Sequence, residues 1–307
     1  MQAFLDAAKK GDIERLRQFV NDNVDLEYRD ANETTALMWA AREGKAECVQ
    51  LLVDANADVN GVDHIGYTAL IWAAARGRMQ CTRLLINANA DVEAKDNYDD
   101  NALTWAVRGG HTECLQLLFD ANADIHTKIN HGSTPVILAA ANRRTACVQR
   151  LIDLRADVKV QDGKNGYTAL MWATRMGDGQ SLRLLVDANA NVADADNDGS
   201  TALMHAVEVG RAGCAQLLID AGADLEVEDH GGRTALLCAA AAGSTECVQL
   251  LIDTKAALDA IDNNGKNALM LAAGGGHTAC VRLLQDLACD AFSTRTFKKP
   301  KLMQGHE

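Results

Sequence analysis

The sequence predicts an all-α repeat solenoid, in which short helix-turn-helix units stack and hairpin-like segments connect them. Three features support this prediction. A Thr-Ala-Leu type tripeptide recurs in one phase, small residues and a glycine follow most copies, and a Cys-x-x-Leu-Leu type segment comes next. The tripeptide starts at Thr35, Thr68, Asn101, Thr134, Thr168, Thr201, Thr234 and Asn267, so successive copies are 33 or 34 residues apart. A fixed period of this length is typical of stacked repeat units.

Each copy has the apolar spacing of two short helices. Leu37, Ala40 and Ala41 follow one another at i, i+3 and i+4, which places them on one face of a first helix. The segment that starts at Cys48 repeats this spacing and predicts a second helix. The Thr or Asn that opens each tripeptide is suited to cap the first helix. A glycine stands where a first helix needs a left-handed residue at its C-terminus, at Gly44, Gly77, Gly110, Gly177, Gly210, Gly243 and Gly276.

The segments between copies are rich in Asp, Asn and Gly, as residues 54–60 illustrate, and we expect extended hairpin-like connectors there. Helices of about 8 to 10 residues are marginal alone, so neighbouring units must stabilise one another. Arg15 and Gln18 replace apolar residues in the first unit, as a capping repeat requires. We therefore predict a capping repeat at 1–33, one continuous solenoid of eight repeats at 34–291, and a basic flexible tail at 292–307.

This pattern resembles the ankyrin-repeat family, whose motif reads Thr-Pro-Leu-His-x-Ala with a following Gly-His. The resemblance covers about residues 2–291. Proline occupies its motif position only at Pro135, and the histidine position holds Met38, Ile71, Thr104, Ile137, Met171, Met204, Leu237 and Met270. The resemblance implies nine helix pairs, a concave face lined by first helices and hairpin tips, and a convex face of second helices.

Composition and charge exclude several classes of protein. The longest apolar run, residues 235–242, is too short to span a bilayer. Nine cysteines without a Cys-x-x-Cys pair, together with an N-terminal stretch that lacks an apolar run, indicate an intracellular protein with reduced thiols, in the cytoplasm rather than the nucleus. The net charge of −12 disfavours nucleic acid as a partner.

Repeats four and five, residues 129–183, are irregular. Arg143 replaces the helix-ending glycine, Arg150 replaces a leucine, Ser181 replaces the recurring cysteine, and the connector near Gly163 has one extra residue. Residues 142–183 carry eight basic side chains against four aspartates. One interpretation is a tolerated insertion with a slight kink. The other is a functional joint whose basic belt meets an acidic partner.

No motif predicts catalysis, a cofactor or a metal. The recurring cysteines lie one per repeat, about 10 Å apart, which is too far for a shared zinc ion or a disulfide. Residues 194–199 imitate the start of a calcium loop, but His205 stands where the loop needs a glutamate, so we expect a hairpin turn. We predict a protein that is not an enzyme.

The aromatic residues predict a binding surface. All four tryptophans, Trp39, Trp72, Trp105 and Trp172, occupy the same first-helix position. A row of such rings supplies rigid anchors for a protein segment. We expect a non-enzymatic interaction scaffold, monomeric outside its complex, whose acidic groove binds a protein or peptide with basic segments. The other residues expected to contact the partner are Tyr67, Tyr98, Asp99, Asp100, Arg143, Arg144 and Tyr167.

Two other functions stay open. In one, the chain is a constitutive subunit of a larger intracellular assembly and docks through the basic belt at Arg143 and Arg144. In the other, Tyr67, Trp72 and Trp105 read methylated lysine, because their placement is similar to the aromatic cage of the ankyrin domains in euchromatic histone methyltransferases. The acidic member of that cage would fall at Ala75. Asn60 also matches the hairpin asparagine that intracellular asparaginyl hydroxylases modify in this family.

Overall fold

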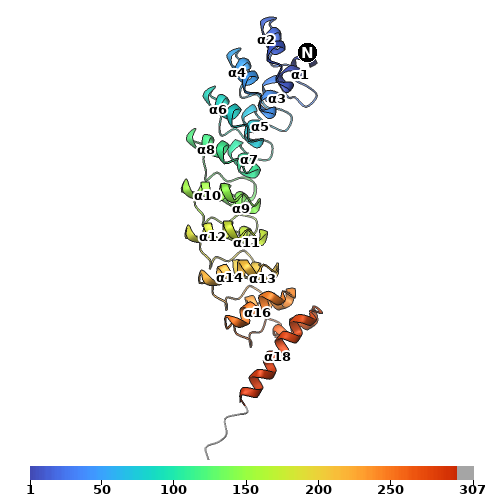
Figure 1. The fold of residues 1–307 in the computed structure, drawn as a ribbon, viewed down its shortest axis with the longest axis vertical. Coiled ribbons are helices and arrows are strands. Elements are labelled where there is room, and N and C mark those ends of the chain that lie inside the picture. The colour runs from blue at the N-terminus through green and yellow to red at the C-terminus, as the bar shows by residue number, and fades with distance from the viewer. Residues whose placement is uncertain (296–307) are drawn as a thin grey trace, which may run out of the picture. The chain divides into compact units, whose positions relative to one another are not determined.

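The computed structural model describes residues 1–295, except the side chains of residue 130 and of residues 287–295. Most of the predicted basic tail at 292–307 therefore lies outside the described residues, and the predicted domain division stays a prediction. The chain forms two compact units, Met1–Asn191 and Val192–Glu307. Within residues 1–295 it folds into 18 α-helices and no strand (Figure 1), which confirms the all-α prediction. No helix in this described part has both the length and the apolar character that a bilayer crossing requires.

The first unit contains six helix pairs and one short 3-10 helix, η1. Its helices are α1 (Gln2–Lys10), α2 (Ile13–Asn21), α3 (Ala36–Glu43), α4 (Ala46–Asp54), α5 (Ala69–Ala75), α6 (Met79–Asn87), α7 (Ala102–Gly109), α8 (Thr112–Asp120), η1 (Asn130–Gly132), α9 (Pro135–Ala141), α10 (Thr145–Asp153), α11 (Ala169–Met176) and α12 (Gly179–Asp187). The second unit contains α13 (Ala202–Glu208), α14 (Ala212–Asp220), α15 (Ala235–Ala242), α16 (Thr245–Asp253), α17 (Ala268–Gly274) and α18 (Thr278–Arg295).

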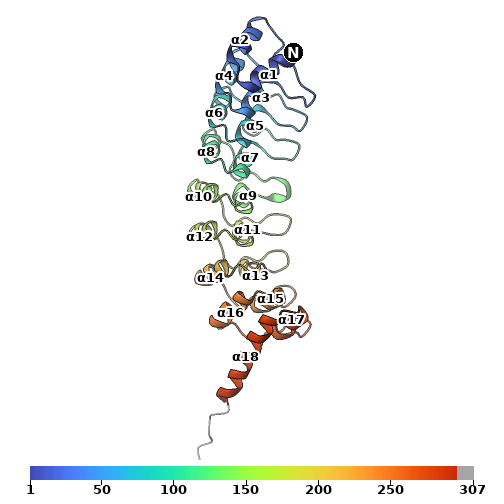
Figure 2. The same cartoon turned by 45° about the vertical axis from the view of Figure 1, so that its right-hand side comes forward.

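The helices of the first unit form two layers. The odd-numbered helices from α1 to α11 pack side by side, the even-numbered helices pack against them and against one another, and the connectors project beside the odd-numbered layer (Figure 2). The core between repeats consists of small and branched residues: Leu37, Ala40, Cys48 and Leu52 are at most 2% exposed. Alanines in the first helices allow this close approach of adjacent repeats.

Capping side chains explain where the first helices begin. The Oγ of Thr68 accepts the backbone N–H of Ile71, and Thr168 does the same for Met171. Asn101 and Thr104 cap each other reciprocally in α7. At Thr35 the N–H donates weakly to the Met38 sulfur, so a methionine partly replaces the histidine of the ankyrin motif. Thr134 and Thr234 make no such bond, and their hydroxyl oxygens are buried without a partner among the described residues.

The predicted left-handed positions are confirmed. Gly44 and Gly110, for example, have φ of 76° and 82° after the ends of α3 and α7. Arg143 keeps this conformation without being glycine, at φ 56°. The irregular repeats otherwise keep the fold, and Arg150 is exposed, so no unpaired guanidinium is buried there.

The connectors are hairpin-like, as predicted. A single antiparallel bridge closes four of them, for example between Lys95 and Asn101. Adjacent connectors are joined by backbone hydrogen bonds, such as that from the Asn97 N–H to the Ile65 carbonyl, 3.1 Å long. These bonds fix the turns that carry the candidate site.

Candidate functional site

The four tryptophans share one hydrogen bond that holds their rings in place. Each indole is half-buried on a first helix, and its N–H donates to an aspartate in the preceding connector. The bonds are Trp39 to Asp30 at 3.0 Å, Trp72 to Asp63 at 2.9 Å, Trp105 to Asp96 at 2.7 Å, and Trp172 to Asp162 at 3.4 Å. The rings are thus fixed before any partner arrives.

Each of these aspartates also shapes its turn. The other carboxylate oxygen of Asp96 accepts the backbone N–H groups of Tyr98 and Asp100, at 2.8 and 3.0 Å. Burial alone would raise the pKa of Asp30, but hydrogen bonds from Thr34, Trp39 and Asn32 outweigh it and leave that pKa lowered. One carboxylate therefore joins each turn to its ring.

Cationic side chains of the chain itself cover several ring faces. The Lys9 ammonium lies 4.1 Å from the Trp39 ring centroid. The Arg42 guanidinium lies 5.0 Å from the Trp39 centroid and 4.4 Å from that of Trp72. Arg108 lies 5.7 Å from the Trp105 centroid. Cation–π attraction stabilises such an arrangement. We call the surface of Trp39, Arg42, Trp72, Trp105 and Arg108 the tryptophan face.

The Tyr67 ring packs between the rings of Trp72 and Trp105. Its ring centroid is 4.8 Å from that of Trp72 and 5.3 Å from that of Trp105, and only 6% of the residue is exposed. Burial, and then the nearby carboxylates of Asp96 and Asp100, raise the pKa of its phenol well above the ordinary range. The three rings of the predicted cage therefore meet.

A pocket opens above these rings. Its volume is about 370 Å³. Its lining residues are Ile65, Tyr67, Trp72, Ala75, Arg76, Trp105, Arg108 and Gly109. Ala75 stands at the repeat position that Arg42 occupies one repeat earlier. Arg42 fills the space between Trp39 and Trp72, whereas the small side chain of Ala75 leaves space beside Trp72 and Trp105.

Two arginines give the pocket its charge. Arg108 pairs with the buried Asp100 through Nη2, at 3.1 Å. Burial raises the pKa of Asp100, and Arg108 opposes this effect. The Nε–H of Arg108 is buried and meets no acceptor among the described residues. Arg76 is exposed, and no carboxylate among the described side chains pairs with it.

The predicted turn residues differ in their exposure. Tyr98 is 56% exposed, and Asp99 is half-exposed and pairs with Lys95 at 2.8 Å. Asp100 is only 4% exposed and is engaged by Arg108. Tyr98 and Asp99 are therefore accessible to a partner, while Asp100 positions an arginine.

The remaining predicted residues lie on later repeats of the first unit. Arg143 and Arg144 are exposed, and the Arg144 Nε–H donates to the Arg108 carbonyl oxygen at 2.9 Å. This bond connects the basic belt to a residue that lines the pocket. Tyr167 and Trp172 form an edge-to-face pair with centroids 5.4 Å apart, and Arg175 covers the Tyr167 ring. Arg175 thus fills the position that Ala75 leaves small.

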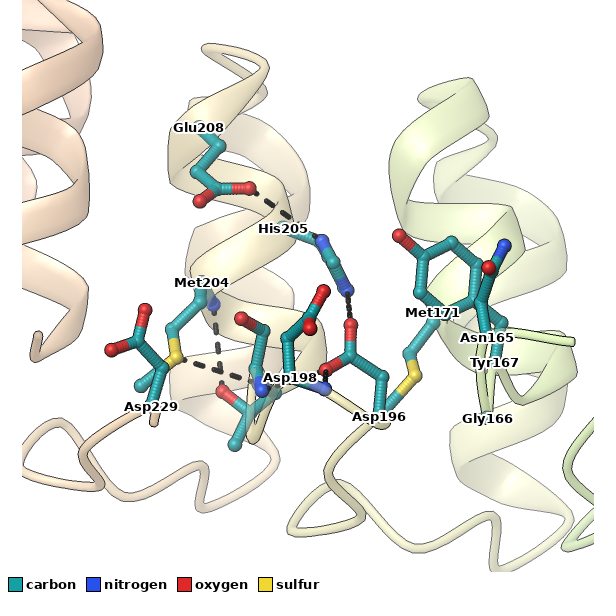
Figure 3. Close-up of polar contacts among 12 residues, drawn as sticks. Asn165, Gly166, Tyr167, Met171, Asp196, Asp198, Met204, His205, Glu208 and Asp229 are labelled. Atoms are coloured by element: carbon teal, nitrogen blue, oxygen red, sulfur yellow. Dashed lines mark hydrogen bonds and ion pairs between the residues drawn. The ribbon is translucent and has the colours of Figure 1, made fainter. Parts of the chain in front are cut away.

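The second unit keeps the aspartate and changes its partner. His205 stands at the tryptophan position, is 3% exposed, and its Nε2 lies 2.8 Å from Asp196 (Figure 3). Its Nδ1 lies 3.7 Å from Glu208. In the next repeat Arg233 bonds to Asp229 at 2.8 Å. Asp196 also accepts the N–H groups of Asp198 and Ser200, so residues 194–199 form the predicted turn.

No group of three or more metal-ligating side chains lies within the described residues. The eight described cysteines are buried free thiols. Burial raises the pKa of Cys81, Cys147 and Cys247 to about 11, so these thiols stay protonated near neutral pH. The site therefore offers rings, guanidinium groups and turn carboxylates for recognition.

The family model for ankyrin repeats matches residues 4–96, 57–129, 94–162, 136–229 and 212–294. The chain belongs to the ankyrin-repeat family. Among solved structures, the human ASB11 ankyrin repeat domain is similar, with a TM-score of 0.66, 26% identity, and coverage of 72% of this chain and 98% of that one. The ankyrin repeat domain of Bcl-3, described as a unique member of the IkappaB protein family, has a TM-score of 0.64, 25% identity, and coverage of 71% and 98%. No curated protein matches the chain. Ankyrin repeats generally serve as non-enzymatic modules for protein–protein interaction.

Sequence reasoning missed the bond between aspartate and tryptophan. The signal was present, because an aspartate precedes every tryptophan of these ankyrin repeats by nine or ten residues. In the fourth of the eight repeats both residues are absent, because Ile129 replaces the aspartate and Leu138 replaces the tryptophan. The covering arginines were also missed, and one of their contacts, that of Arg42 with Trp72, crosses from one repeat to the next.

Proposed function

We propose that the chain is a non-enzymatic scaffold whose tryptophan face binds a segment of a partner protein. The pocket between Trp72 and Trp105 carries this proposal. It combines three aromatic walls with rings that are already fixed by hydrogen bonds to aspartates. Preorganised aromatic anchors lose little conformational entropy when a partner binds. Trp39, Tyr98 and Asp99 extend the contact surface on either side.

The net charge indicates the type of partner, and the thiols indicate the location of the chain. The net charge of −12 favours basic segments in the partner, which would lie over exposed turn carboxylates such as Asp99. The buried free thiols support an intracellular location, for which we favour the cytoplasm. We expect a monomer outside the complex.

The methyl-lysine alternative ranks below this proposal. Tyr67, Trp72 and Trp105 do approach one another, but Arg42 and Arg108 already lie over two of the rings. Arg76 and Arg108 line the pocket, and no acidic residue does. A cationic ligand would therefore meet like charge without a counterion.

The basic belt supports a second candidate function, permanent docking into a larger assembly. Arg143 and Arg144 are adjacent and exposed, and Arg150 on α10 and Arg155 just after that helix are exposed as well. An acidic partner surface would be complementary to them. In this case the pocket would contribute nothing to binding.

One substitution separates the two candidates. Ala75→Arg fills the pocket with the side chain that Arg42, Arg108 and Arg175 already place at this repeat position, so the fold should tolerate it. Ala141→Arg is the matched control one repeat after Arg108. Affinity capture with the full chain, followed by mass spectrometry, should show partners that Ala75→Arg loses and Ala141→Arg keeps. Partners that survive Ala75→Arg and are lost with Arg143→Glu and Arg144→Glu would instead favour the belt.

A further inference from the structure

The chain itself provides a reference for what fills the space between two successive tryptophans. Between Trp39 and Trp72 that group is the Arg42 guanidinium, and its neighbour Glu43 lies 3.9 Å from it as a counterion. One repeat later the same two positions hold Ala75 and Arg76. Ala75 thus leaves space where Arg42 places a guanidinium, and Arg76 is basic where Glu43 is acidic.

This exchange reverses the charge that the pocket can accept. The lining contains two arginines and no carboxylate. Arg108 is partly neutralised by Asp100, but its buried Nε–H has no acceptor among the described residues. Arg76 has no ion-pair partner among the described side chains. A buried donor without an acceptor is costly, and a shift of the Arg108 guanidinium toward a ligand oxygen in the pocket would remove that cost.

The remaining walls define the rest of the ligand. Ile65, Tyr67, Trp72 and Trp105 present a methyl-bearing chain and three flat rings. Such walls favour an apolar stem, either aromatic or aliphatic, over a fully polar group. A volume of about 370 Å³ accommodates one side chain with its stem.

We propose that the pocket between Trp72 and Trp105 binds a carboxylate on an apolar stem, presented as an acidic side chain of the bound protein segment. Arg76 and Arg108 pair with the carboxylate, and the stem packs against Tyr67 and the two indoles. This inference rests on the proposed function and adds the chemistry of the anchor. The segment as a whole stays basic where it passes the turn carboxylates, so its acidic residue would be a local feature.

Two small probes of similar shape and opposite charge test the proposal. 3-Phenylpropionate carries a carboxylate, and 3-phenylpropylamine carries an ammonium group. The readout is the ¹H–¹⁵N signals of the four indole N–H groups in the full chain, assigned with single Trp→Phe variants. We expect the carboxylate to shift the Trp72 and Trp105 signals saturably, with a Kd of about a millimolar to ten millimolar. The Trp172 signal is the internal control. In that repeat Arg175 stands at the position that corresponds to Ala75, so the side chain fills the space that Ala75 leaves open.

Charge reversal provides the matched variants. Arg76→Glu should raise the Kd of 3-phenylpropionate by about tenfold or more and should allow 3-phenylpropylamine to bind. Arg83→Glu makes the same charge change at an exposed arginine of α6 outside the lining, and should leave both probes unchanged. Ala75→Arg should abolish the Trp72 and Trp105 shifts, and Ala141→Arg should preserve them.

Two results would overturn the inference. If the amine or benzyltrimethylammonium shifts Trp72 and Trp105 in the unmodified chain while the carboxylate does not, the pocket selects cations. If none of the probes shifts these signals, the pocket has no such affinity. In either case the proposed function still stands when Ala75→Arg abolishes partner capture, and it fails separately when capture survives that substitution.

Discussion

The Trp105 indole N–H donates a 2.7 Å hydrogen bond to Asp96, and the same carboxylate accepts two backbone N–H groups of its own turn. The connector and the first helix of a repeat are therefore joined through one buried side chain. This joint recurs at all four tryptophans and keeps the aromatic rings at fixed positions on the tryptophan face. The stability of the turns and the proposed recognition thus depend on the same aspartates.

Asp96→Ala should destabilise the chain more than the same substitution at an exposed aspartate. It leaves the Tyr98 and Asp100 N–H groups and the Trp105 indole without their acceptor, which should lower the free energy of unfolding by about 2–4 kcal/mol. Urea denaturation followed by circular dichroism measures this. The control is Asp120→Ala, since Asp120 is exposed at the end of α8 and accepts a bond from the Gln116 side chain, and it should cost less than about 1 kcal/mol. Equal effects of the two substitutions would contradict this role of Asp96.

Two threonines at equivalent positions should respond differently to valine. Thr168 caps α11 through the Met171 N–H, so Thr168→Val should lower the free energy of unfolding by about 1 kcal/mol. Thr134 has a buried hydroxyl oxygen without a partner among the described residues, so Thr134→Val should be neutral or should stabilise by up to about 1 kcal/mol. The same urea titration compares them. A larger loss for Thr134→Val than for Thr168→Val would refute the assignment of the caps.

The chain should be more stable with glycine than with arginine at position 143. The φ of 56° at Arg143 lies in the left-handed region, where a residue with a Cβ is strained by about 1–2 kcal/mol. Glycine relieves this strain but is more flexible when unfolded, so Arg143→Gly should stabilise by about 0.5–1 kcal/mol. Arg144→Gly is the control: with φ of −96° it gains nothing, and it loses the bond to the Arg108 carbonyl. Thermal unfolding should move in opposite directions for the two variants.

The sequence was sufficient to predict the fold, and only part of the site. A fixed phase of 33 residues determines which positions face a neighbouring repeat, so the helix pairs, the glycine ends and most of the threonine caps followed from it, Thr134 and Thr234 being the exceptions. It also placed Trp39, Trp72 and Trp105 on successive first helices. It did not show that Arg42 lies over Trp72, because that contact depends on how one repeat packs on the next. Ala75 was interpreted as a missing cage acid, and only the packed structure relates it to Arg42.

Burial of the recurring cysteines predicts low thiol reactivity in the folded chain. Burial raises the pKa of Cys81, Cys147 and Cys247 to about 11 and that of Cys238 to about 12. At pH 8 a thiol with a pKa of about 11 is roughly one part in a thousand thiolate, against about a quarter for a free cysteine. The folded chain should therefore react with Ellman's reagent only as repeats open, and all thiols should react rapidly in guanidinium chloride.

The Cys289→Ser variant is the protein for this measurement, because the Cys289 side chain lies outside the described part of the chain. Mass spectrometry after a short pulse of iodoacetamide identifies which cysteines react first. Slow, uniform labelling would agree with thiols packed between ankyrin repeats. Rapid labelling of Cys81 in the folded chain would mean that adjacent repeats separate readily. The tryptophan face, whose Trp72 lies in the same repeat as Cys81, would then lose the rigidity on which its binding is proposed to depend.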